Sequence, residues 1–261
     1  MQLPFYKYQG TGNDFIMIDH REPLLTDWHE QLVSRLCDRR FGIGADGLIL
    51  LQKHPDYDFQ MVYFNADGRE GSMCGNGGRC VVAFAKFLNV IDQTCSFLAV
   101  DGPHEANIQS DNWVELKMSA VDQLEKGPDY YYLNTGSPHY VQFVENVAGF
   151  DVVGQGKAIR YSDRFKAVGT NVNFVQRTAE GIEVATYERG VEDETLSCGT
   201  GVTAAAMAYH QQLGNGHQDF AVKVQTKGGQ LEVRFTQRGT TYADVWLCGP
   251  AQRVFSGTIN T

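Results

Sequence analysis

The stretches that decide the fold are "MCGNGGRCVVAFA" (residues 73–85) and "SCGTGVTAAAMA" (residues 197–208), which share a Cys-Gly-x-Gly start followed by a helix-like run. Their cysteines, Cys74 and Cys198, are 124 positions apart, and weaker matches keep nearly the same offset. "GNDFI" from Gly12 matches "GSPHYV" from Gly136, "GADGLI" from Gly44 matches "GTNVNF" from Gly169, and "YFNADG" and "TYERG" approach the two cysteines in turn. A repeat at half the chain length indicates two similar halves in tandem.

Composition narrows the class of protein. The 261 residues favour two domains, and 43% hydrophobic with 20% charged residues is typical of a globular protein. A net charge of −9, without a stripe of Lys and Arg between aromatics, argues against nucleic-acid binding and suits a small zwitterionic or cationic ligand. No apolar run is long enough to cross a membrane and the start of the chain shows no export signal, so we expect a cytoplasmic protein with reduced cysteines.

The pattern of apolar residues predicts many strands and few helices. Strands are expected at "FIMID", "GLILLQ", "FQMVYF", "WVELKM", "YVQFV", "IEVATYE", "FAVKVQT", "QLEVRF" and "YADVWL". One helix should start near Asp27 with Thr26 or Asp27 as its cap, and two apolar helices should follow Cys74 and Cys198, the second stopping at "GNG" (residues 214–216).

These elements predict an α/β (α+β) fold. Each half is expected to be a strongly bent, mainly antiparallel sheet or barrel around one central helix, and the two domains to be pseudo-symmetric. We expect an N-terminal half of residues 1–113 plus 250–261 carrying Cys74, and a C-terminal half of residues 114–249 carrying Cys198. A cleft between the halves would be the natural ligand site.

The six cysteines are expected to have different roles. Cys37, Cys80, Cys95 and Cys248 are expected to be packing residues. Cys74 and Cys198 each directly precede a helix, where unpaired N–H groups favour a thiolate. Two such thiols on opposite sides of one stereocentre could remove a proton from one face and return one to the other, which is racemisation. The same helix ends could bind a carboxylate.

Other interpretations of these segments remain open at this point. A zinc site is disfavoured by the five residues that separate the cysteines of "CGNGGRC". A disulfide between Cys74 and Cys198 would form only on oxidation. A phosphate loop is disfavoured because neither segment completes a nucleotide-binding fingerprint.

Seven motifs, spread over nearly the whole chain, carry a resemblance to a known family. They are "GTGNDF" (residues 10–15), "GIGADGLI" (42–49), "FNADGREGSMCGNGGRC" (64–80), "NTGSPHYV" (134–141), "GTNVNF" (169–174), "YERGVEDETLSCGTG" (187–201) and "CGPA" (248–251). In order and spacing the chain resembles the diaminopimelate epimerases. The resemblance implies an isomerase that interconverts LL- and meso-2,6-diaminopimelate in lysine biosynthesis without a cofactor or metal, acting on a small molecule as a homodimer.

The resemblance also assigns roles to residues. It implies Cys74 and Cys198 as the acid and base, and His139 with Glu188 as residues that tune the thiols. The substrate would contact Asn13, Asn65, Gly75, Asn76, Asn171, Glu188, Arg189, Gly199 and Thr200, with Arg189 suited to the distal carboxylate. Gly47 and Ser137 are two further substrate-binding positions, but Gly47 stands where some members carry glutamine and Ser137 replaces an asparagine, so these contacts would be altered. The loop before Cys198 has one extra residue.

Two further functions stay open from the sequence. Related folds racemise or epimerise other amino acids, namely those of the proline, hydroxyproline or histidine type. A non-catalytic amino-acid binding protein would use the same cleft and tolerate serine at both cysteines.

Overall fold

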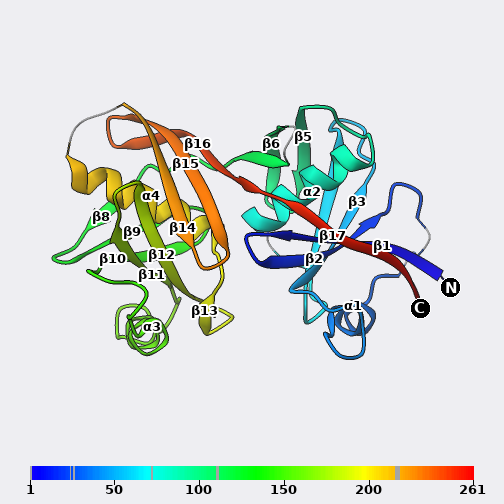
Figure 1. Ribbon diagram of the computed structural model, residues 1–261, viewed down its shortest axis with the longest axis horizontal. Helices are drawn as coiled ribbons and strands as arrows, with labels where there is room; N and C mark the ends of the chain where they lie inside the picture. The colour runs from blue at the N-terminus through cyan, green and yellow to red at the C-terminus, as the bar shows by residue number, and fades with distance from the viewer. Residues whose placement is uncertain (1, 24, 26, 72, 110–111, 215–217) are drawn as a thin grey trace. The chain divides into compact units, whose positions relative to one another are not determined.

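The chain forms two compact units (Figure 1). The computed structural model describes residues 2–23, 25, 27–71, 73–109, 112–214 and 218–261. Unit 1 consists of Met1–Leu116 with Gly249–Thr261, and unit 2 of Lys117–Cys248. Among the described residues, no helix combines the length and the apolar character that crossing a membrane requires.

Unit 1 is a ladder of strands with two helices. The strands are β1 (Gln2–Gly10), β2 (Asn13–Asp19), β3 (Gly47–Gln52), β4 (Phe59–Asn65), β5 (Thr94–Ala99), β6 (Gly102–Ile108), β7 (Trp113–Lys117) and β17 (Gln252–Asn260), and the helices are α1 (Glu30–Cys37) and α2 (Gly75–Phe87). From β17 through β1 and on to β7, each strand pairs with the next, and all pairs are antiparallel except β2–β3 and β4–β5.

Unit 2 repeats this plan. Its strands are β8 (Leu124–Lys126), β9 (Tyr130–Asn134), β10 (Pro138–Phe143), β11 (Asn171–Arg177), β12 (Gly181–Glu188), β13 (Asp193–Thr195), β14 (Asp219–Thr226), β15 (Gly229–Arg238) and β16 (Thr241–Pro250), and its helices are α3 (Val152–Arg160) and α4 (Gly199–Leu213). From β8 to β16 the pairs are again antiparallel except two, β10–β11 and β12–β14, which fall at the same places in the order.

Each unit is built around one buried helix, as the sequence predicts. Every residue of α2 from Gly75 to Ala85 is buried, and α2 packs on β1, β2, β3, β6 and β17. In unit 2, α4 packs on β9 to β12, β14 and β15, and most of its residues are buried. A helix that is apolar on most sides is stable only where protein surrounds it. The α+β fold with two repeated domains is confirmed.

Two details of the helices differ from the sequence-based expectation. The first helix begins at Glu30 rather than near Asp27, because the ring nitrogen of His29 accepts from the backbone N–H of Leu32 and so caps it; Thr26 lies outside the described residues. Helix α3 was not expected, since Gly154 and Gly156 weaken a helix. Asp151 caps it through Gly154, and a Cβ on Gly156 would lie 2.4 Å from Cβ of Tyr187, so the glycine allows close packing.

All nine expected strands are confirmed, and the apolar runs did not single out β1, β5, β6, β8, β9, β11, β13 and β17; β17 lies within residues 250–261, which the sequence assigns to the N-terminal half. The helix after Cys198 ends at Leu213 with the left-handed Gly214 as its cap, where the sequence predicts the stop. Residues 215 and 216 of the expected stop signal lie outside the described part of the chain.

Candidate active site

Cys74 lies at the N-terminus of α2 and is half-buried. Its Sγ lies 3.5 Å from Oδ1 of Asn13. Asn13 is held there by the tight turn between β1 and β2, in which Gly10 pairs with Asn13 and the two residues between, Thr11 and Gly12, have φ of 50° and 86°. Positive φ at both central residues is the geometry of the favoured two-residue hairpin turn. The turn therefore delivers the Asn13 amide to the thiol.

The orientation of the Asn13 amide is fixed by its partners. Nδ2 of Asn13 donates to the carboxylate of Asp46 at 2.6 Å, and a carboxylate oxygen only accepts, so Oδ1 must face the opposite way, toward Cys74. Nδ2 of Asn76 also donates to this Oδ1, at 3.3 Å. Asn76 is fixed in turn because its own Oδ1 accepts from the guanidinium of the fully buried Arg79 at 2.9 Å. The Asn13 oxygen thus receives hydrogen bonds and gives none.

A cluster of charges supports this turn. Asp14 forms ion pairs with Lys7 and Arg39, each at 2.7 Å, and Arg39 also pairs with Asp46 at 2.7 Å. Burial alone would raise the pKa of Asp14, but the hydrogen bonds from Arg39 and Lys7 outweigh it and hold that pKa well below its ordinary value. Asp46 therefore accepts from the guanidinium of Arg39 as well as from the amide of Asn13.

Two more of the expected residues lie at the same end of the strands of unit 1. Gly47 begins β3, pairs with Phe15 of β2 on one side and with Asn65, the exposed last residue of β4, on the other. A Cβ on Gly47 would lie 2.5 Å from the ring of Tyr63 and 2.6 Å from the carbonyl oxygen of Phe64. A side chain at position 47 would therefore force Tyr63 or the backbone of β4 to shift.

Cys198 occupies the equivalent place in unit 2. It precedes α4, is half-buried, and its Sγ lies 3.5 Å from Oγ1 of Thr200. The Thr200 carbonyl accepts from Oγ1 of Thr135 at 2.8 Å, which ties the first turn of α4 to the end of β9. The thiol therefore faces a hydroxyl in unit 2, whereas in unit 1 it faces an amide oxygen.

His139, on β10, is fully buried and contacts this hydroxyl. Its Nε2 lies 2.9 Å from Oγ1 of Thr200 and 2.9 Å from Oγ of Ser137. Its Nδ1 lies 3.0 Å from Nδ2 of Asn173, which also donates to the carbonyl of Tyr140 at 3.0 Å. Burial is the main cause that lowers the pKa of His139 to about 3, and nearby Arg189 acts in the same direction. His139 is therefore neutral at physiological pH.

Asn171 joins the remaining residues of unit 2. Its Nδ2 donates to Oγ of Ser137 at 3.1 Å and its Oδ1 accepts from the backbone N–H of Arg189 at 2.9 Å. Glu188 ends β12, and the exposed Arg189 follows it and donates from its guanidinium to the Val168 carbonyl at 3.0 Å. Asn171 is 4% exposed, so it positions its neighbours rather than offering an open surface.

The structure thus groups the expected residues into two half-sites. Hydrogen bonds join Asn13, Cys74 and Asn76 in unit 1 and Ser137, His139, Asn171, Cys198 and Thr200 in unit 2, while Gly75 and Gly199 begin the two central helices. Sequence reasoning missed Asp46, Arg79 and Asn173. Period-two alternation places Asn173 on the same face of β11 as Asn171, and Arg79 lies one helical turn after Asn76, so both left a signal in the sequence.

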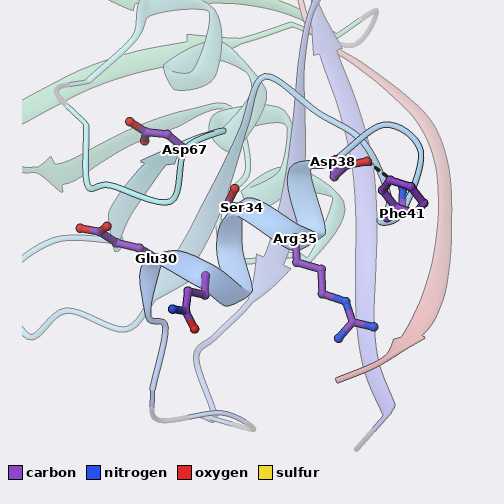
Figure 2. A pocket seen from close by; sticks show the side chains of 7 residues that line it. Glu30, Ser34, Arg35, Asp38, Phe41 and Asp67 are labelled. Atoms are coloured by element: carbon purple, nitrogen blue, oxygen red, sulfur yellow. Dashed lines mark hydrogen bonds between the residues drawn. The ribbon is translucent and has the colours of Figure 1, made fainter.

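The other cysteines are buried, and a pocket in unit 1 lies beside α1. Burial raises the pKa of Cys37, Cys80 and Cys95 to about 12, so these thiols stay protonated. An open pocket of about 500 Å³ is lined by side chains of α1 and of nearby loops, among them Glu30, Arg35, Phe41 and Asp67 (Figure 2). None of the expected site residues lines it.

Comparison with known proteins adds sequence and fold relatives. The family model described as diaminopimelate epimerase matches residues 5–123 and 131–254. The chain is 50% identical over 258 residues to a diaminopimelate epimerase of Flavobacterium psychrophilum, covering 98% of this chain and 100% of that protein. It is 43% identical over 259 residues to a diaminopimelate epimerase of Chlorobaculum tepidum, covering 96% and 98%.

Two solved structures share the fold at low identity. A PhzF-family phenazine biosynthesis protein of Bacillus anthracis superposes with a TM-score of 0.78 at 12% identity over 100% of both chains. A hydroxyproline epimerase of Agrobacterium vitis superposes with a TM-score of 0.70 at 14% identity over 99% of this chain and 92% of the other. At such identities the likeness concerns the fold alone.

Proposed function

The chain belongs to the diaminopimelate epimerase family, and from this premise we propose that it interconverts LL- and meso-2,6-diaminopimelate in lysine biosynthesis. It is an isomerase of the racemase and epimerase class. The observation that carries the proposal is the duplicated half-site: each unit has one half-buried thiol at the N-terminus of its buried central helix.

In the proposed reaction one cysteine acts as thiolate and the other as thiol. The thiolate takes the α-proton, so the Cα–H bond breaks and an S–H bond forms. The second thiol then gives its proton to the opposite face of the α-carbon, which breaks that S–H bond and leaves a thiolate. The reverse reaction exchanges the roles of Cys74 and Cys198, and no proton or electron is lost.

The helix N-termini supply the second requirement of this chemistry. Negative charge moves into the α-carboxylate as the α-carbon loses its proton, and N–H groups aimed at that carboxylate stabilise the transition state. We assign this task to Gly75 and Asn76 in unit 1 and to Gly199 and Thr200 in unit 2, whose backbone N–H groups lie in the first turns of α2 and α4.

The remaining residues are proposed to orient the substrate. Asn65 and Arg189 are exposed at the ends of β4 and β12, and the planar guanidinium of Arg189 suits the distal carboxylate. Glu188, beside it, carries a charge that can pair with the distal ammonium group. Asn13 and Asn171 act mainly through the thiol and the Arg189 loop, because their amides are engaged there. His139, and with it Glu188, tunes the thiol of Cys198.

Two finer features rest on the family resemblance. We propose that the enzyme works as a homodimer in the cytoplasm, and sedimentation of the purified chain at micromolar concentration tests the oligomeric state.

The mechanism also needs both sulfur atoms to reach one α-carbon. Formation of a Cys74–Cys198 disulfide under mild oxidation would support that requirement.

The decisive experiment follows deuterium from solvent into the α-position of LL-diaminopimelate under reducing conditions. The wild type should exchange the α-proton and form the meso isomer, while Cys74→Ser and Cys198→Ser should each lower the rate by about 10²–10⁴-fold. Cys95→Ala, which changes a buried thiol of β5, is the matched control and should exchange at the wild-type rate. Absence of exchange by the wild type would refute the function, and faster exchange of proline or hydroxyproline would redirect the assignment to another amino acid.

A further inference from the structure

Equivalent positions of the two half-sites carry different polar groups. At the offset of 124 residues that relates Cys74 to Cys198, Asn13 corresponds to Ser137 and Asn76 to Thr200. In unit 1 the pair is joined by an amide hydrogen bond of 3.3 Å, and in unit 2 the pair lies 3.1 Å apart through hydroxyl oxygens. The duplicated thiols therefore have the same backbone setting and chemically different side-chain neighbours.

In unit 1 the neighbour of the thiol is an acceptor. The carboxylate of Asp46 accepts from Nδ2 of Asn13. Arg79 orients the amide of Asn76 so that Nδ2 of Asn76 donates to Oδ1 of Asn13. A carboxylate, which only accepts, stands at one end of this chain of hydrogen bonds, and a guanidinium, which only donates, stands at the other. The two amides therefore cannot reverse their orientation. The S–H of Cys74 can donate to Oδ1 of Asn13, whereas a thiolate there would face its lone pairs.

In unit 2 the neighbour of the thiol is a donor. The carbonyl of Tyr140 accepts from Asn173, and Thr186 donates to Oδ1 of Asn173 at 2.9 Å, so the Asn173 amide has one allowed orientation and its Nδ2 donates to Nδ1 of His139. The neutral imidazole then carries its proton on Nε2, which lies 2.9 Å from both Oγ1 of Thr200 and Oγ of Ser137 and can donate to either hydroxyl.

Ser137 adds a second donor to the same hydroxyl. Its oxygen accepts from Nδ2 of Asn171, and its own proton can go to Oγ1 of Thr200 at 3.1 Å. A hydroxyl has two acceptor sites and one proton. Neither the Nε2–H of His139 nor the hydroxyl proton that Ser137 donates can accept the proton of Thr200, so that proton is left to point at Sγ of Cys198, 3.5 Å away.

We infer that the two thiols rest in opposite protonation states, with Cys74 as the neutral thiol and Cys198 as the thiolate. The hydrogen-bond acceptor at Cys74 stabilises S–H, and the donor at Cys198 stabilises the negative sulfur. The helix N-termini favour a thiolate at both positions alike, so the side chains decide the difference. Its catalytic meaning rests on the proposed function: the resting enzyme accepts first the isomer whose α-proton faces Cys198.

Asn173 is a positioning residue in this scheme, because it acts on the sulfur only through His139 and Thr200. Charged groups also contact the partners of each thiol. In unit 1 Asp46 contacts Asn13 and Arg79 contacts Asn76, with Asp14, Lys7 and Arg39 paired beside Asp46, and in unit 2 Arg189 acts on His139 and follows Glu188. The test must therefore separate the hydrogen-bonding neighbours from these charges, which the variants below leave in place.

The test measures the alkylation rate of each thiol by iodoacetamide between about pH 5 and pH 10, in the reduced, substrate-free full chain, with each cysteine resolved by peptide mass spectrometry. Cys198 is measured in the Cys74→Ser background and Cys74 in the Cys198→Ser background, which avoids coupled titration. We expect Cys198 to titrate at least about one pH unit below Cys74. The opposite order in the otherwise unchanged chain overturns the inference.

Variants test the cause. Thr200→Val keeps the shape but removes the hydroxyl and should raise the pKa of Cys198 by about one unit, while Thr200→Ser should retain the wild-type value. Asn13→Ala should lower the pKa of Cys74 and leave Cys198 unchanged. In ¹⁵N-labelled wild type, NMR should find the His139 proton on Nε2, and Asn173→Ala should release that preference. A proton on Nδ1 in the wild type, or no shift in Thr200→Val, refutes the relay.

These measurements use no substrate, so they are independent of the proposed function. If the thiols titrate in the expected order but no α-proton is exchanged, the epimerase assignment fails and the inference about protonation stands. If exchange proceeds and Cys74 is the more acidic thiol, the inference alone fails.

Discussion

Replacing Asn173 by alanine should destabilise unit 2 strongly, because the side chain is fully buried and its amide is hydrogen-bonded. Its fully buried amide makes three hydrogen bonds, to His139, to the Tyr140 carbonyl and from Thr186, at 3.0, 3.0 and 2.9 Å. Each buried hydrogen bond contributes about 1 kcal/mol, and the substitution leaves all three partners without this amide. The expected loss is about 3 kcal/mol in the free energy of unfolding, which is a change of roughly 150-fold in the unfolding equilibrium.

Urea unfolding followed by tryptophan fluorescence measures this loss in the right unit. The chain has three tryptophans, and of these only Trp246 belongs to unit 2, so a background with Trp28→Phe and Trp113→Phe makes the signal specific. Asn146→Ala is the matched control, because this exposed asparagine of the same unit makes one hydrogen bond, to the backbone N–H of Ala148, and should change stability by less than about 0.5 kcal/mol. A loss below about 1 kcal/mol for Asn173→Ala, or one equal to that of the control, would refute the reasoning.

Three further predictions concern acid stability and packing. His139 has a folded-state pKa of about 3 against an ordinary 6.5, so between these pH values the unfolded chain binds a proton that the folded chain does not. The free energy of unfolding of unit 2 should therefore fall by up to about 1.4 kcal/mol per pH unit as the pH falls through that window. His139→Gln should remove this slope in urea titrations at several pH values. The pKa of Asp14 is depressed, so its stabilisation of unit 1 is present above the ordinary value of 3.8 and is lost as the pH falls below it; Asp14→Asn should flatten that part of the acid-unfolding curve, and an unchanged curve would contradict the role of the ion pairs. Gly47→Ala would place a methyl 2.5 Å from the ring of Tyr63 and 2.6 Å from the Phe64 oxygen, and should cost about 1–3 kcal/mol; a wild-type melting temperature would show that the neighbours move aside without strain.

Much of the fold could be predicted because the sequence contains an internal repeat. The helices after Cys74 and Cys198 follow from glycine-led apolar runs, and the constant offset implies that their surroundings repeat. The observed order of antiparallel and parallel strand pairs is the same in the two units. Local apolar patterns were sufficient for nine strands, of which β7, β14 and β15 alternate most clearly between buried and less buried residues.

The features that the sequence did not predict depend on contacts between distant residues. Helix α3 has two internal glycines and is stable because Gly156 packs on Tyr187 of β12. β1 and β5 were not predicted although burial alternates in them, with Leu3 and Phe5 buried in β1 and Cys95, Phe97 and Ala99 buried in β5. The orientation of Asn13 depends on Asp46, 33 positions away, and no local pattern reveals that an amide faces the sulfur with its oxygen. Whether the neighbour of each thiol donates or accepts a hydrogen bond therefore depends on the tertiary structure.

The pairing of β17 with β1 also sets an order of events during synthesis. Strand β1 spans Gln2–Gly10 and its partner β17 spans Gln252–Asn260, so unit 1 lacks one strand of its ladder until residue 260 has been made. Unit 2, Lys117–Cys248, is complete in sequence before that strand leaves the ribosome. The ladder of unit 1 therefore cannot be complete before the sequence of unit 2 has been made, and its edge along β1 stays open until β17 pairs with it.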